Sequence, residues 1–135
     1  MGRPVEWIIE KLGSLINRSS FKGSVYIFNS SAFALTRLVT GQLDAYIDIT
    51  GWLVDDGNKN THLPQFSTHK MVMGLVANDI AAACLIAREC HGAISDSWGD
   101  PQDDQSLISK DIFSCTAASN LELHQMLVNW LNKSD

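Results

Sequence analysis

The sequence predicts an α/β fold in which helices pack on a mixed β-sheet. Segments with apolar residues at helical spacing alternate along the chain with short runs of β-branched and aromatic residues, and turn residues separate them. Hydrophobic residues make up 45% of the 135 residues. A chain of this length buries roughly two-thirds of its unfolded surface. We therefore expect a single α/β domain over residues 1–135.

The first half of the chain predicts two helices and two strands. In chain order they are helix 4–17, strand 23–28, helix 31–40 and strand 43–49. Ser30 or Ser31 is suited to cap the second helix, and Gly41 is suited to end it. These local signals make helix 31–40 the best-bounded element of this half.

The second half begins with a long segment, residues 50–74, that shows no steady period. This loop is either a lid, an insertion or a plain surface excursion, and its residues do not decide between them. Asn120 is a suitable cap for the last helix. The expected elements are strand 70–76, helix 79–90, strand 93–95, strand 111–117 and helix 120–132.

Composition excludes several classes of protein. The formal net charge is −5 and no basic patch is present, so we expect no nucleic-acid partner. No apolar run reaches membrane-spanning length, and Glu6, Glu10 and Lys11 interrupt any signal-peptide core. We therefore expect a soluble, cytoplasmic protein with no membrane partner.

The chain has three cysteines without CxxC spacing. Cys84 and Cys90 lie in or beside helix 79–90, and Cys115 lies in a strand-like run. Because neither the count nor the spacing fits a disulfide framework or a zinc site, we expect buried, reduced thiols.

Asp79 stands at the start of an otherwise small and apolar helix, in the stretch ANDIAAACLIARECHG of residues 77–92. One interpretation is that Asp79 caps the helix, which needs no ligand and which the residues alone favour. The other is that it holds a charged group. A carboxylate at this position is a hard oxygen ligand for Mg²⁺, and a helix N-terminus favours phosphate.

Three segments together resemble the inositol monophosphatase family. They are TGQLDAYID (40–48), NDIAAACLIARECHG (78–92) and AISDSWGDP…FSCTAASNLELHQMLVNWL (93–131). The resemblance runs from about Gly23 to the end and implies the fold of that family's C-terminal domain. It also implies a Mg²⁺-dependent phosphatase that acts on small phosphomonoesters such as inositol or sugar phosphates, and formation of a dimer.

The resemblance assigns roles to five residues. It implies that Asp79 is a Mg²⁺ ligand and that the turn and strand end bind substrate hydroxyls through Ser30, Ser31, Ala32 and Asp48. The alternative is that Ser30 and Ser31 cap a helix and that Asp48 is a solvated strand end. The chain departs from the family pattern where Asn29 replaces a glycine and Asn78 replaces a tryptophan.

The family's remaining metal ligands are absent from this chain. An acidic pair on a helix and the motif D-P-[IL]-D-G-T are both missing, so we assign no catalytic residue and expect the chain to be inactive alone. Three explanations fit: a C-terminal piece of a longer enzyme, one half of a split enzyme, or a degenerate homologue that acts as a binding or assembly module. We favour the first. The expected partners are a small phosphorylated substrate, an N-terminal half and a second copy.

Overall fold

A computed structural model describes residues 9–10, 12–17, 25–28, 30–53, 74–102, 106–108 and 111–133. Residues 9–10 and 12–17 are helical, in agreement with the expected first helix. The other elements are α2 (Ser31–Val39), β1 (Ala45–Asp48), the 3₁₀ helix η1 (Thr50–Leu53), α3 (Ala77–Glu89), β2 (Ala93–Ser95), β3 (Cys115–Ala118) and α4 (Leu121–Leu131).

The strands form a three-stranded sheet in the order β1-β3-β2. Both pairs are antiparallel, and Ala117 of β3 lies opposite Tyr46 of β1 and Ile94 of β2. The expectation of a mixed sheet is therefore wrong for the strands that the structure describes. An isolated antiparallel bridge pairs Leu75 with Phe113, two residues before β3 begins.

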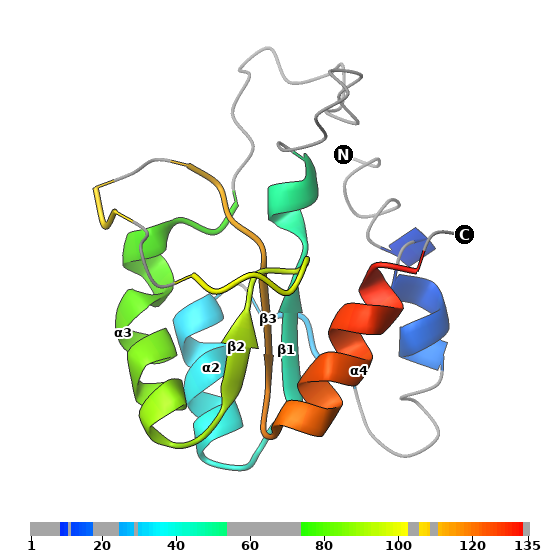
Figure 1. Cartoon of the computed structure of the whole chain (residues 1–135), viewed down its shortest axis with the longest axis horizontal. Helices are drawn as coiled ribbons and strands as arrows, with labels where there is room; N and C mark the ends of the chain where they lie inside the picture. Colours follow the sequence, from blue (N-terminus) through cyan, green and yellow to red (C-terminus); the bar gives the residue numbers. More distant parts are fainter. Residues whose placement is uncertain are drawn as a thin grey trace.

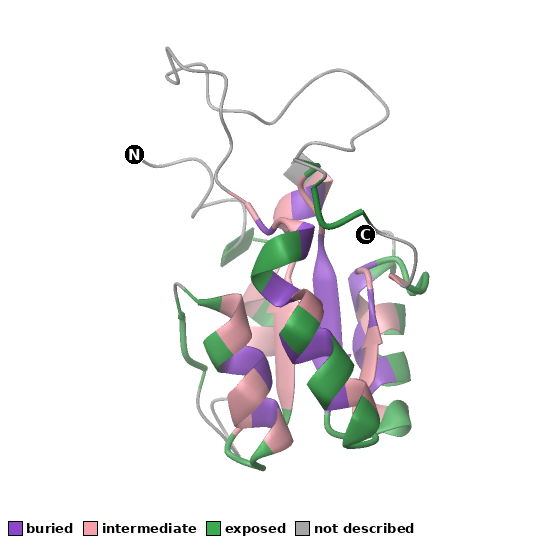
Figure 2. Ribbon diagram, turned by 90° about the vertical axis from the view of Figure 1, so that its left-hand side faces the viewer, coloured by how far each residue is buried: buried purple, intermediate pink, exposed green. Residues whose placement is uncertain are grey.

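Helices cover both faces of this sheet, which gives three layers. Helices α2 and α3 lie side by side on one face and α4 lies on the other (Figure 1). The central strand β3 is buried along its whole length, while the helices turn exposed faces outward (Figure 2). The core between the sheet and helices α2 and α3 contains Leu35, Leu38, Leu75, Ile80, Ala83, Cys84, Cys115 and Ala117. The α/β fold class is confirmed.

Local capping signals confirm the bounds of two helices. The side chain of Ser30 accepts a hydrogen bond from the backbone N–H of Phe33 (3.3 Å), which caps α2. Gly41 follows the end of α2 with φ +71°, a conformation that glycine adopts without strain. Asn120 caps α4 by accepting from the N–H of Leu123 at 2.9 Å.

The expected strand 23–28 is wrong in its described part, because residues 25–28 form no strand. Their side chains are exposed, and the rings of Tyr26 and Phe28 stack with centroids 5.8 Å apart. Phe28 also meets Phe33 of α2 edge to face. A strand needs a partner edge, and none of the described strands pairs with this segment.

Other expectations are met in part. Strand 93–95 is confirmed, α3 begins two residues earlier than expected, and the expected strand 111–117 starts only at Cys115. Cys84 and Cys115 are buried free thiols as expected, whereas Cys90 is exposed, since it follows the last turn of α3. Most of the expected 50–74 loop lies outside the described residues. Of the helices that the structure describes, none has the length and apolar character that crossing a membrane requires.

Candidate functional site

Helices α2 and α3 both begin at the end of the sheet where β1 ends and β3 begins, which we call the site edge (Figure 1). Ser31, the first residue of α2, is hydrogen bonded to Tyr46 of β1. Gly74, just before α3, lies against Thr50, because a methyl group at Gly74 would lie 3.2 Å from the Thr50 Oγ1. Two helix N-termini, each with a positive partial charge, therefore meet at this edge.

Tyr46 links Ser31 with Asp48. Its hydroxyl donates to Ser31 Oγ at 2.7 Å and lies 3.3 Å from Asp48 Oδ2, so one phenolic proton serves two acceptors. Burial, followed by the negative charge of Asp48, raises the pKa of Tyr46 far above its usual value. The phenol therefore stays protonated and joins two of the expected substrate-binding residues into one network.

Asp48 is fixed by the turn that follows β1. Its Oδ1 accepts hydrogen bonds from the backbone N–H of Thr50 (2.8 Å) and from the Thr50 hydroxyl (2.5 Å). The turn stays close to the sheet because Gly51 passes over the start of β3, where a methyl group would lie 2.5 Å from the backbone nitrogen of Ser114. The interpretation of Asp48 as a merely solvated strand end is therefore wrong, since it is half-buried and hydrogen bonded.

The other two expected substrate-binding residues differ from Ser31. The oxygen of Ser30 is used by the cap of α2, which leaves its hydroxyl proton to donate. The methyl group of Ala32 packs against the core under α2. Only the backbone N–H of Ala32 can therefore meet a ligand, as one of the free amide groups of the helix's first turn.

Asp79 is exposed in the first turn of α3. The N-cap of α3 is Val76, so the interpretation of Asp79 as a plain N-cap is wrong. Its charge at this end of the helix is worth about 0.3–1 kcal/mol through the helix dipole. Among the described residues no hydrogen bond joins Asp79 to Ser31 or Asp48, although all three lie on elements that meet at the site edge.

These carboxylates do not make a magnesium site by themselves. In the part of the chain that the structure describes, no three His, Cys, Asp or Glu side chains lie close enough to hold a metal ion. Asp48 already accepts from Thr50 and Tyr46. Asp79 offers one carboxylate, whereas Mg²⁺ demands near-octahedral oxygen coordination. The donor set at the site edge is therefore incomplete.

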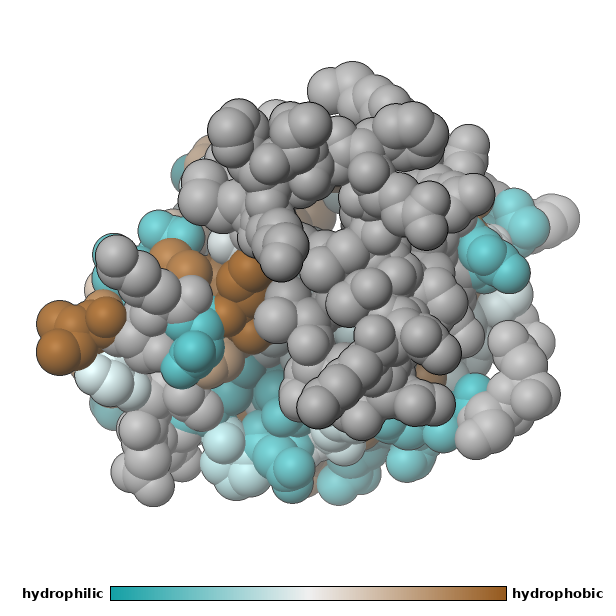
Figure 3. All heavy atoms as spheres, turned by 90° about the horizontal axis from the view of Figure 1, so that it is seen from above, coloured by the Kyte–Doolittle hydropathy of each residue, from teal (hydrophilic) through white to brown (hydrophobic). Residues whose placement is uncertain are grey.

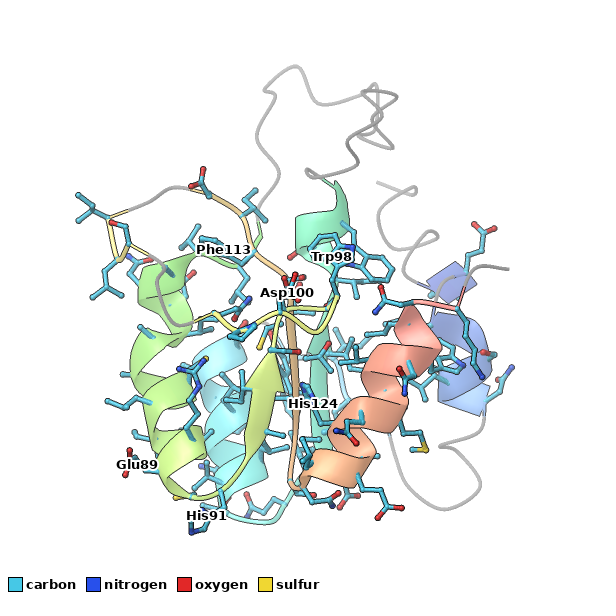
Figure 4. All side chains as sticks on the ribbon, in the orientation of Figure 1. Glu89, His91, Trp98, Asp100, Phe113 and His124 are labelled. Atoms are coloured by element: carbon cyan, nitrogen blue, oxygen red, sulfur yellow. The ribbon has the colours of Figure 1, made fainter. Side chains whose placement is uncertain are left out.

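The turn at residues 96–100 completes the site edge, although none of its residues was expected to be a site residue. The Oδ1 of Asp96 accepts from the backbone N–H groups of Trp98, Gly99 and Asp100 at 2.8–2.9 Å. Trp98 and Asp100 lie at this edge, whereas Glu89 and His91 lie at the opposite end of the domain (Figure 4). The polar residues and Gly99 predict a turn here, but not its place beside Asp48, because that place depends on a contact 49 positions away along the chain.

Ser97 joins this turn to β1 and β3. Its hydroxyl donates to the backbone oxygen of Asp48 (3.2 Å), and its N–H donates to the Ser114 hydroxyl (3.0 Å). The ring of Trp98 lies 5.7 Å from that of Trp52 in η1, measured between centroids. The turn and η1 therefore hold the Asp48 end of β1 from two sides.

A buried serine–histidine pair lies under α4. Ser95 Oγ is 2.9 Å from His124 Nε2, and the Ser95 hydroxyl donates its proton to the backbone oxygen of Asp96 at 2.6 Å. Burial lowers the pKa of His124, so the ring is neutral, and its Nε2–H donates to Ser95 Oγ, whose own proton is used by Asp96. Ser95 is 3% and His124 8% exposed. Substrate cannot reach this pair, and its role is to join β2, β3 and α4.

No family model, curated protein or solved structure matches the chain.

Proposed function

We propose that the chain is the C-terminal-domain part of a Mg²⁺-dependent phosphatase of the inositol monophosphatase type. In this proposal it contributes one metal ligand, Asp79, and a binding surface for the hydroxyls of a small phosphorylated alcohol or sugar. The supporting observation is the network of Ser31, Tyr46 and Asp48 at the edge where α2 and α3 begin.

The chemistry of this edge suits a polyol phosphate. The Asp48 carboxylate accepts hydrogen bonds from substrate hydroxyls, and Thr50 fixes its orientation in advance. The hydroxyls of Ser30 and Ser31 donate, as does the free N–H of Ala32. The two helix N-termini attract the negative charge of the phosphate. In a completed site Mg²⁺ would supply charge neutralisation at phosphorus, with Asp79 among its ligands.

The chain is expected to be inactive alone, because several precisely placed charges act together in phosphate-ester hydrolysis. The described residues offer fewer than three metal-ligating side chains in any one place. The missing carboxylates would come from an N-terminal half, either on the same polypeptide or on a partner.

A calorimetric titration with Mg²⁺ and Mn²⁺ tests the role of Asp79. We expect weak binding heat that Asp79→Asn removes and that Asp44→Asn preserves, since Asp44 is an exposed aspartate of the turn before β1, at the far end of that strand. Heat that is absent, or that persists in Asp79→Asn, would remove Asp79 from the proposal.

A second titration with inositol 1-phosphate tests the hydroxyl-binding surface. Asp48→Asn should weaken binding at least severalfold, with Asp44→Asn again as the control. Robust Mg²⁺-dependent hydrolysis by the pure chain would contradict the expectation that it is inactive alone.

A non-catalytic binding or assembly module is the second candidate. It is favoured by the exposed side chains of residues 25–28, of which Tyr26 is 61% and Ile27 89% exposed, and by the incomplete donor set at the site edge. Concentration-dependent association in sedimentation velocity, together with silent metal titrations, would support this candidate over the first.

A further inference from the structure

Two of the three thiols meet in the core although they belong to different elements. Cys84 lies in the middle of α3 and Cys115 is the first residue of β3. Both residues belong to the same buried cluster, and each thiol is near enough to shift the pKa of the other. Both thiols are free and buried.

Cys84 is the member of the pair that a small solute can reach. It lines a cavity of about 280 Å³ between α3 and the segment before β3, together with Ile80, Arg88, Gln102, Leu107 and Phe113. Hydrophobic atoms gather on the α3 side of the domain in the view onto the site edge (Figure 3). A molecule as small as hydrogen peroxide fits this cavity. Because Cys84 is only 7% exposed, a bulky aromatic reagent has little access to its sulfur.

The surroundings give the two thiols different reactivity. The hydrogen bond from Cys115 lowers the pKa of Cys84; burial opposes this, and the positive charge of Arg88 supports it. The same hydrogen bond, followed by burial, raises the pKa of Cys115. Since the thiolate is the nucleophile, Cys84 is the thiol that attacks first and Cys115 is the one that stays protonated beside it.

We propose that Cys84 and Cys115 are a redox-sensitive pair that a hydroperoxide converts into an intramolecular disulfide. The Cys84 thiolate attacks one oxygen of hydrogen peroxide, the O–O bond breaks, and sulfenic acid and hydroxide form. The sulfur of Cys115 then attacks the sulfenic sulfur, its proton leaves with the hydroxyl as water, and the S–S bond forms. The proton lost by Cys84 neutralises the hydroxide, so two thiols and one peroxide give one disulfide and two waters.

The disulfide would act on the site edge. Cys115 lies directly opposite Asp48 in the register of β1 and β3, and Cys84 is on the helix whose first turn holds Asp79. A covalent link between α3 and β3 would fix these two elements relative to each other. The inference concerns the thiols alone and does not depend on the proposed phosphatase function.

The test uses the Cys90→Ser chain, which removes the exposed thiol and leaves only the pair. After treatment with stoichiometric hydrogen peroxide, the intact mass should fall by two hydrogen atoms and the thiol titre of the denatured chain should fall from two to none. Peptide mapping should find residues 84 and 115 cross-linked, and dithiothreitol should reverse the change. Non-reducing electrophoresis should show a single-chain species.

Two further variants separate the steps. In Cys90→Ser/Cys115→Ser, whose hydroxyl can still donate to Cys84, dimedone added together with denaturant should trap a sulfenic acid at Cys84, and in Cys90→Ser/Cys84→Ala, Cys115 should remain a thiol. The peptide map of the Cys90→Ser chain decides the outcome if either variant fails to fold. Disulfides formed between chains, peroxide oxidation without a cross-link, or unchanged thiols would each overturn the proposal.

Discussion

The two faces of the sheet are joined to their helices by different interactions. The face toward α2 and α3 is mainly apolar, with Leu35, Ile80 and Ala83 packed against Cys115 and Ala117. The face toward α4 is joined by directed hydrogen bonds, namely His124 to Ser95 of β2 and Asn132, at the end of α4, to the backbone oxygen of Ser97 (2.9 Å). The Ser97 hydroxyl in turn pairs with that of Thr116 in β3.

Because of this difference, one face mainly stabilises the domain and the other mainly positions the 96–100 turn beside Asp48. Burial of apolar surface is non-directional, so the α2/α3 face supplies stabilisation in proportion to area without fixing any one angle. Hydrogen bonds fix geometry and are costly to leave half-made when they are buried. The α4 face therefore determines where the 96–100 turn stands beside Asp48, while the opposite face provides most of the hydrophobic stabilisation.

The largest effect is expected in the apolar layer. Leu35 of α2 is fully buried, so Leu35→Ala should lower the free energy of unfolding by about 2–5 kcal/mol through lost burial and a residual cavity. Urea denaturation of this variant measures the loss. Leu121→Ala, at a residue 61% exposed, is the matched control and should change stability little. Equal losses in the two variants would contradict the comparison.

A smaller effect is expected in the polar layer. Ser97→Ala should cost about 1–3 kcal/mol, since it leaves the Thr116 hydroxyl and the Asp48 backbone oxygen without this partner in buried surroundings. The exposed Ser106→Ala is the control. Amide chemical shifts of residues 96–100 and Thr50 should move in the first variant. If they stay in place, Ser97 does not position the turn.

Part of the fold could be predicted from the sequence and part could not. Helix α4, strand β2 and the caps Ser30 and Asn120 were predicted because their signals are local. Residues 25–28 have strand-forming composition but form no strand, since pairing depends on a partner distant in sequence.

The site, like the fold, was predicted in some of its residues but not in the contacts that join them. Ser31 and Asp48 were predicted as site residues, and the structure brings them together, but the bridge through Tyr46 was not anticipated. Nor was the contact of Ser97 with Asp48, which spans 49 positions. The pairing of Cys84 with Cys115 is equally non-local. The metal role of Asp79 stays a prediction.

The smallest effect is a pH dependence of stability, which we expect from His124 on the α4 face. Burial lowers the pKa of His124 below its ordinary value of 6.5. Just below that pH the unfolded chain binds a proton that the folded chain does not, so stability is fully present above pH 6.5 and falls as the pH falls through it.

Urea midpoints between pH 5.5 and 7.5 measure this dependence. His124→Gln should flatten the slope over this range. His91→Gln, at an exposed histidine, should keep it. A slope that survives in His124→Gln would assign the dependence to another group.

The position of β3 has a consequence for the order of events during synthesis. Among the described strands, β1 and β2 each pair with β3 and not with each other, yet β3 is the last of the three to be translated. A nascent chain that ends before Cys115 therefore holds two outer strands with nothing between them, while α2 and α3 can already contact each other. Sheet formation must wait for residues 115–118, and a ribosome paused upstream would expose two unpaired strand edges to other chains.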